Sequence, residues 1–155
     1  MIIDAKELCA SDIKGKGRAL CIDYGDRRVG IAISDINWLI SSPLTVLNSH
    51  GVYGELISII DEYEVCLIVV GTPLPLNGDA SGKQLYKVKK FISKLNDIMP
   101  NMPIITWDER QSTNGAQRVL ERADISRKRF KDKIDKVAAS FILEGFLSYC
   151  KTVSL

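Results

Sequence analysis

Carboxylates at three separate places in the chain are the residues best suited to chemistry. The first is Asp23, inside a short apolar run that reads as a strand. An acid in a buried strand is costly unless it is paired or binds a cation. Because side chains alternate along a strand, Asp23 shares a face with Cys21. The opposite face carries Leu20, Ile22 and Tyr24. Asp23 could therefore be a metal ligand, or a strand-end acid that hydrogen-bonds its own turn.

A second acidic pair, Asp108 and Glu109, directly follows the apolar stretch 103–107, and Arg110 comes next. Ligand sites in sheets with parallel strands tend to form at the carboxyl ends of those strands. Asp108 could equally cap a following helix, where acids are favoured near the start. For Glu109 a functional role is the preferred interpretation, because it lies at the strand tip.

The third acid, Asp135, precedes an apolar helical stripe. Helical spacing places it in line with Ala138, Ala139 and Ile142. An acid at the rim of such a stripe, beside small alanines, should face a sheet rather than open water. Asp135 could also be an acid in the first turn of a helix that Asp132 caps.

Three carboxylates around one sheet edge would suit a divalent cation. Mg²⁺ and Mn²⁺ prefer oxygen ligands and leave positions for water and phosphate. Two such ions about 3.5–4 Å apart can activate water and stabilise the leaving oxygen in phosphodiester hydrolysis. Zinc is disfavoured, because no pair among the four cysteines has zinc-ligand spacing. The single histidine, His50, lies in a Ser-His-Gly sequence typical of a solvated turn, which argues against a histidine-based triad.

Two basic segments accompany these acids. The first has seven basic residues, with three acids among them: Arg122, Arg127, Lys128, Arg129, Lys131, Lys133 and Lys136. The second consists of Lys83, Lys87, Lys89 and Lys90. Alone, such segments are most simply solvated surface. Beside a carboxylate site they would suit a phosphate backbone.

The composition is that of a soluble globular protein. Its 155 residues suit one domain, with 46% apolar and 26% charged residues. No apolar stretch approaches the roughly 18–20 residues that span a bilayer. Residues 1–17 lack the apolar centre of a signal peptide and read as an N-terminal extension that ends in a flexible Lys-Gly-Lys-Gly. We therefore expect a cytoplasmic protein without membrane association.

The element order predicts an α/β fold. Two antiparallel strands come first, and alternating helix–strand units follow, which indicates a mixed five-stranded sheet with helices on both faces. The glycine- and proline-rich loop 71–82 could bind an anion or be an ordinary connection. The predicted strands are 19–24, 29–34, 42–47, 65–70 and 103–107, and the predicted helices are 51–63, 83–99, 112–122 and 133–149.

Four segments resemble the YqgF/RuvX family of RNase H-like proteins. They are residues 22–35, 69–73, 107–113 and 134–139, in an order and spacing that span nearly all of 18–149. The first segment is the most specific. The resemblance implies an RNase H-like nuclease domain over 18–155, with residues 1–17 outside it.

The same resemblance implies roles for single residues. Asp23, Glu109 and Asp135 would form an acidic triad that holds Mg²⁺ or Mn²⁺, with Asp23 bridging metal ions rather than transferring a proton. Arg28 and Arg110 match basic positions of the family and would bind phosphates. We add Lys83, from the second basic segment, to this substrate-binding set.

Two departures from the family pattern leave the substrate contacts open. Gln111 stands where an apolar residue is more usual. Pro75 is a second proline in the glycine-rich loop. Neither departure affects the expected fold.

The family implies a metal-dependent endonuclease that acts on structured nucleic acid, with processing of the 5′ end of precursor 16S rRNA in ribosome biogenesis as the first hypothesis. Holliday junction resolution on branched DNA is an alternative. It would call for a homodimer, for which the sequence shows no interface. Another alternative is a ribosome-assembly factor that binds nucleic acid without cutting it. A kinase- or actin-like nucleotide hydrolase is set aside, because 155 residues cannot supply the two domains it needs.

Overall fold

The computed structural model describes residues 1–9, 13–73, 79–108 and 127–153, with the backbone alone at residues 6, 9, 79–81 and 127–136. The elements within these ranges are α1 (Ala5–Cys9), β1 (Arg18–Tyr24), β2 (Arg28–Ser34), β3 (Ser41–Asn48), α2 (Val52–Glu62), β4 (Val65–Thr72), α3 (Asp79–Ile98), β5 (Ile104–Asp108) and α5 (Arg127–Val153). None of the helices in these ranges is both long and apolar enough to cross a membrane.

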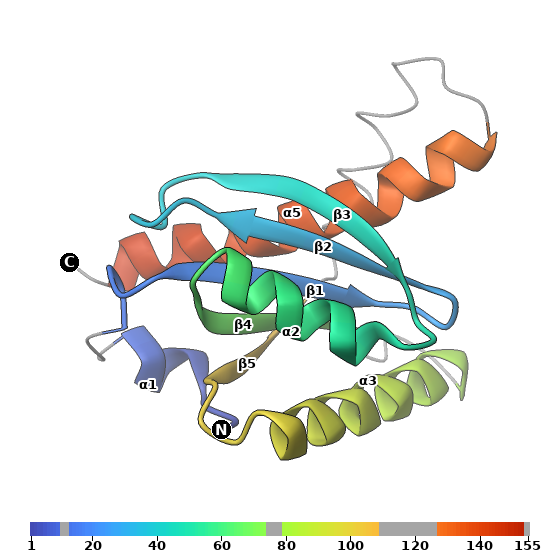
Figure 1. Ribbon diagram of the computed structural model, residues 1–155, viewed down its shortest axis with the longest axis horizontal. Helices are drawn as coiled ribbons and strands as arrows, with labels where there is room; N and C mark the ends of the chain where they lie inside the picture. Colours follow the sequence, from blue (N-terminus) through green and yellow to red (C-terminus); the bar gives the residue numbers. More distant parts are fainter. Residues whose placement is uncertain (10–12, 74–78, 109–126, 154–155) are drawn as a thin grey trace.

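The five strands form one mixed sheet in the order β3-β2-β1-β4-β5 (Figure 1). β2 pairs antiparallel with both β1 and β3. β4 pairs parallel with both β1 and β5. The predicted mixed five-stranded sheet is therefore confirmed, including the hairpin of its first two strands.

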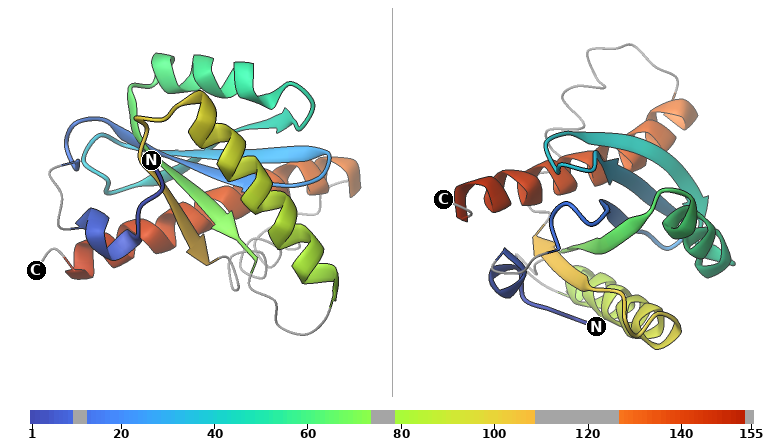
Figure 2. Two further views of the ribbon diagram at one scale, coloured as in Figure 1. Left: turned by 90° about the horizontal axis from the view of Figure 1, so that it is seen from below. Right: turned by 60° about the vertical axis from the view of Figure 1, so that its left-hand side comes forward.

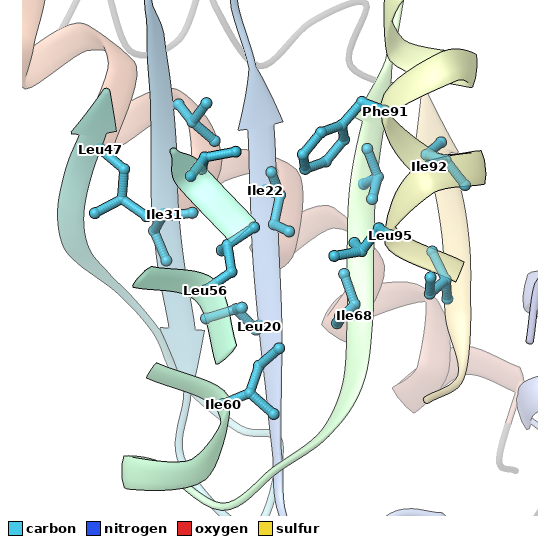
Figure 3. Packing of buried hydrophobic residues seen from close by; sticks show 14 of the residues in the cluster. Leu20, Ile22, Ile31, Leu47, Leu56, Ile60, Ile68, Phe91, Ile92 and Leu95 are labelled. Carbon is cyan, nitrogen blue, oxygen red and sulfur yellow. The ribbon is translucent and has the colours of Figure 1, made fainter. Parts of the chain in front are cut away.

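Helices cover both faces of the sheet, as predicted (Figure 2). On one face, α2 and α3 pack over Leu20, Ile22 and Ile31 (Figure 3). On the other, α5 packs over a cluster that contains Cys21 and Ala139. The alternation predicted for β1 is confirmed, because its even and odd residues enter different clusters.

Several predicted boundaries are wrong. The expected loop 71–82 is shorter at both ends. β4 continues through Thr72, since Gly71 and Thr72 still pair with β5, and α3 already begins at Asp79. The last helix runs from Arg127 to Val153 rather than over 133–149. The predicted helix 112–122 lies outside the described residues.

The N-terminal segment is bound to the sheet edge. The backbone N–H of Ile3 donates to the carbonyl of Ile104 at 2.9 Å, and the N–H of Ile104 donates to the carbonyl of Met1 at 2.8 Å. The expected flexible end of this segment is wrong at Gly17, which is buried and whose carbonyl accepts the indole N–H of Trp38 at 3.0 Å. The division into an extension, 1–17, and a domain, 18–155, stays a prediction.

Candidate active site

The carboxyl ends of β1, β4 and β5 meet along one side of the sheet, which we call the carboxyl edge. Ile22 of β1 pairs with Val70 of β4. Thr72, two residues further along β4, pairs with Asp108 of β5. Asp23 and Asp108 therefore emerge at the same edge, with β4 between their strands. This is the place where sheets of this kind form ligand sites.

Asp23 lies near the end of β1, one residue beyond the last pair of β1 with β4. It lies opposite Gly30 of β2 and is half-buried. Alternation puts it on the face that α5 covers, next but one to the fully buried Cys21. The structure thus places this carboxylate as the sequence predicted, near a strand end and on the face of Cys21.

Arg28 begins β2, directly across the hairpin turn from β1. It is half-buried and pairs with Asn48 of β3. The turn is closed by the N–H of Gly25, which donates to the carbonyl of Arg28 at 2.9 Å. One tight turn therefore brings the predicted phosphate-binding Arg28 to the same end of the sheet as Asp23.

Lys83 is exposed near the start of α3. The neighbouring Gln84 donates through Nε2 to the carbonyl oxygen of Tyr24 at 2.9 Å. This bond ties the helix to the residue that follows Asp23. The structure therefore brings Lys83 to the carboxyl edge, as its predicted role in substrate binding requires.

Asp108 ends β5 and is half-buried. Beside it, the hydroxyl of Thr72 donates to the carbonyl of Trp107 at 3.3 Å, which binds the ends of β4 and β5 together. Glu109 and Arg110 lie outside the described residues. Their predicted roles stay predictions.

Asp135 belongs to the N-terminal half of α5, and its side chain is outside the described residues. One turn further along, Ala138 and Ala139 are buried, and Ala139 packs in the same cluster as Cys21. The N-terminal half of α5, drawn in orange, lies at the end of the sheet to which the arrowhead of β1 points (Figure 1). The backbone thus carries residue 135 to the side of the sheet on which Asp23 lies.

The metal site cannot be assembled from the described side chains alone. Within them, no group of three or more His, Cys, Asp or Glu residues could hold a metal ion. Two of the three predicted ligands, Glu109 and Asp135, are outside that set. His50 is exposed in a turn after β3, as predicted.

Two residues of α3 fix this helix to the carboxyl edge, a role that was not predicted for either of them. Besides Gln84, Lys87 contributes an ion pair, with its Nζ 2.7 Å from Oδ1 of Asp26 in the hairpin turn. A signal for Gln84 was present, because it continues the core-facing spacing of Val88 and Phe91. A polar residue on such a stripe needs a hydrogen-bond partner.

A family model described as RuvX, Holliday junction resolvase, matches residues 17–149. A relative from Thermoanaerobacter pseudethanolicus is 43% identical over 134 residues, covering 84% of this chain and 95% of the relative. One from Halothermothrix orenii is 44% identical over 135 residues, covering 85% and 95%. Both carry the name "Putative pre-16S rRNA nuclease".

Among solved structures, RuvC of Thermus thermophilus in complex with a Holliday junction substrate superimposes with a TM-score of 0.54. The match has 10% sequence identity and covers 86% of this chain and 95% of that one. A second structure of Thermus thermophilus RuvC gives a TM-score of 0.52 at 8% identity. At such identities the likeness concerns the fold, and the predicted RNase H-like fold is confirmed.

Proposed function

Because this chain belongs to the RuvX family of nucleases, described as Holliday junction resolvases, we propose that it hydrolyses phosphodiester bonds in structured nucleic acid. The preferred substrate is precursor 16S rRNA, cut at its 5′ end during ribosome biogenesis in the cytoplasm. The names of the relatives from Thermoanaerobacter and Halothermothrix support this choice. The structural observation that carries the proposal is Asp23 at the carboxyl edge, the edge to which Arg28 and the lysine-bearing start of α3 also belong.

In this proposal Asp23, Glu109 and Asp135 are the carboxylates that hold Mg²⁺ or Mn²⁺. Their oxygen-only donor set suits these hard cations. When bound, such ions supply an activated water and stabilise the charge on the leaving oxygen. The strand pairing of Asp23 fixes its backbone before substrate arrives, which limits the reorganisation that its carboxylate would need.

The basic residues of the chain position the phosphate backbone. Arg28 offers a planar set of N–H donors that match two phosphate oxygens at once. Lys83, exposed beside the bond of Gln84 to Tyr24, would provide a mobile charge at the same edge. Arg110 would bind a further phosphate from the segment after β5. Together they would orient the scissile phosphate against the carboxylates.

Holliday junction resolution is the second candidate, and the description of the matching family favours it. It uses the same carboxylates on branched DNA. Symmetric cutting of two strands would require a homodimer. The two candidates differ in substrate and in assembly but share the catalytic role of Asp23.

The test is a cleavage assay on a precursor 16S rRNA fragment and on a four-way DNA junction, each with Mg²⁺ or Mn²⁺. Asp23→Asn should lower the cleavage rate by about 100-fold or more, since it removes charge where the reaction needs it. Asp61→Asn is the matched control, because Asp61 is an exposed acid near the end of α2. It should cut like the wild type.

Three outcomes separate the hypotheses. Cutting of the rRNA fragment near its 5′ end supports the preferred substrate, and symmetric nicks in the junction support resolution. Undiminished cleavage by Asp23→Asn would overturn the catalytic assignment. If the protein bound both substrates but formed no product with either metal, the nuclease hypothesis would give way to that of a nucleic-acid-binding assembly factor.

A further inference from the structure

The outer surface of α3 carries an aromatic ring in solvent. Tyr86 is 68% exposed, the highest value among the exposed large hydrophobic residues of the described chain. The opposite side of the helix is buried through Val88, Phe91 and Leu95. Tyr86 contributes nothing to that core, so its ring is free to meet another flat, apolar surface.

Lysines surround this ring. Between residues 83 and 94 the helix has five lysines and no acid: Lys83, Lys87, Lys89, Lys90 and Lys94. All five are exposed. Lys83 lies one turn before Tyr86 and Lys90 lies one turn after it, because residues three or four apart are neighbours on a helix.

If the outer face of α3 served solubility alone, it would be expected to carry acids as well as lysines. Exposed helices usually mix charges, since Glu–Lys pairs four residues apart stabilise a helix and like charges at that spacing destabilise it. Here Lys83–Lys87 and Lys90–Lys94 are like pairs. The ion pair of Lys87 with Asp26 offsets one charge of the five. The remaining positive charge fits a polyanion.

The same helix is rigidly joined to the carboxyl edge. Gln84 is bonded to the carbonyl of Tyr24 at 2.9 Å, and the rings of Tyr24 and Phe91 stack with centroids 4.4 Å apart. Further along, Nζ of Lys94 lies 4.7 Å from the ring centre of Tyr53 on α2. Tyr24 follows Asp23 directly, so the position of Tyr86 is set relative to the candidate active site.

We propose that the outer face of α3 binds a single-stranded segment of nucleic acid beside the cleavage site. A base stacks on the ring of Tyr86, and Lys83 and Lys90 bind the phosphates on either side of it. This inference rests on the proposed nuclease function and specifies its substrate, which must have unpaired nucleotides next to the scissile bond.

A single strand fits this face better than a duplex does. Stacking on an aromatic side chain requires a base whose flat face is exposed, and base pairs inside a duplex are closed to such contact. Lysines that bind phosphate are indifferent to sequence. The face should therefore select for unpaired structure rather than for particular bases.

The experiment measures the binding of a fluorescent 12-nucleotide oligouridine and of a 12-base-pair RNA duplex to the full chain. EDTA is present, so that cleavage does not interfere. Tyr86→Ala should weaken single-strand binding about 5- to 150-fold, the range that corresponds to the loss of one stacked base. Duplex binding should change less than twofold. Tyr86→Phe should bind like the wild type, because it keeps the ring.

Two further variants sharpen the test. Lys90→Gln should make single-strand binding less dependent on salt, lowering the slope of log affinity against log salt by about 0.7. Ile40→Ala is the matched control, since Ile40 is 64% exposed but lies after β2, at the opposite end of the sheet. It should leave both affinities unchanged.

The proposal would be overturned if Tyr86→Ala bound the single strand as tightly as the wild type does. It would also be overturned if the substitution weakened binding of the single strand and of the duplex equally. Tyr86 is on the surface and alanine favours helix, so the variant should fold. The outcome is separable from the cleavage test. If Asp23→Asn lost cleavage but Tyr86→Ala bound normally, only this inference would be contradicted. If Tyr86→Ala lost single-strand binding but the wild type cleaved no substrate, only the nuclease function would be contradicted.

Discussion

Gly25 determines how sharply the chain reverses next to Asp23. Its N–H donates to the carbonyl oxygen of Arg28, and a Cβ placed on it would come 2.7 Å from that same oxygen. Real Cβ atoms are essentially never so close to a backbone oxygen. Any side chain at this position must widen the turn and so separate Asp23 from Arg28.

We expect Gly25→Ala to lower the free energy of unfolding by about 1–3 kcal/mol, as overpacking does elsewhere. It should also reduce kcat/KM for cleavage, because the turn positions both residues. Urea unfolding and the cleavage assay measure the two effects.

Gly54→Ala is the matched control for Gly25→Ala. Gly54 lies inside α2, and a Cβ there would meet nothing within 4 Å. Alanine should therefore stabilise the helix by up to about 1 kcal/mol and leave cleavage unchanged. If both alanine variants had the same stability and activity, the turn would not be as tight as the geometry indicates.

Sequence patterns predicted the positions of some residues of the site but not of others. The period of two in a strand was enough to place Asp23 on the face of Cys21, because it depends only on local geometry. The bond of Gln84 to Tyr24 joins residues 60 positions apart. No local pattern specifies which carbonyl lies opposite a helix, so this tie could be found only in three dimensions.

At the scale of elements, the loop 35–40 between β2 and β3 is organised by one carboxylate. Asp35 accepts backbone N–H groups from Leu39 and Ile40, each at 2.7 Å, and from Asn37 at 3.1 Å. These donors, Ile40 foremost, hold the pKa of Asp35 below its ordinary value. The loop also holds Trp38 at a φ of 57°, with its side chain buried.

Asp35→Ala should lower the free energy of unfolding at pH 7 by about 1 kcal/mol, which is below the usual range for hydrogen bonds to charged groups because Asp35 is largely solvated. The pKa of Asp35 is lower in the folded state than in the unfolded one. Its stabilising effect is therefore complete above the unfolded value of 3.8 and is lost as the pH falls through the folded value.

Urea unfolding of the wild type and Asp35→Ala between pH 7 and pH 2.5 checks this dependence. The difference between them should be constant down to about pH 5 and should shrink at lower pH. Asp61→Asn, on the exposed side of α2, provides the control for a general loss of negative charge. A difference that stayed constant through the acid range would contradict the role given to the Asp35 carboxylate.

The order of the elements from β1 onward was predictable, but α1 and the ends of several elements were not. Short apolar runs indicated the strands, and a period of 3.6 in the apolar residues indicated α2, α3 and most of α5. The residues of 71–82 are rich in glycine and proline and read as a loop. Pairing with β5 nevertheless extends β4 to Thr72, because ladder partners outweigh local propensity.

The start of α5 was also not predicted from the sequence. The helix begins at Arg127, and Phe130 is the only apolar residue in the stretch 127–132. A pattern that detects buried faces cannot detect a turn of helix that carries few apolar side chains. The sequence therefore predicted the middle of α5 and missed both of its ends, including Cys150, which is buried in the same cluster as Ala139.

For the molecule as a whole, the N-terminal segment covers the edge of the sheet at β5. Ile2 forms a parallel bridge with Ile104, and Leu8 of α1 is buried in the cluster beneath α5. The family match begins at residue 17, so this cover is additional to the part of the chain that matches the family model. Exposed sheet edges are templates for pairing with other chains.

Removal of residues 1–9 should therefore have two effects. The free energy of unfolding should fall by about 2–4 kcal/mol, through the loss of Leu8 burial and of two backbone hydrogen bonds. The uncovered β5 should also make the protein associate as its concentration rises, which sedimentation measures. Leu8→Ala separates the two effects, because it removes core contacts and keeps the edge covered. This variant should be less stable than the wild type but should not associate more.

The truncated protein should cut at the wild-type rate per folded molecule, since Ile104 begins β5 and the carboxyl edge lies at the other end of that strand. A truncated chain that matched the full chain in stability and in sedimentation would show that the segment does not protect this edge.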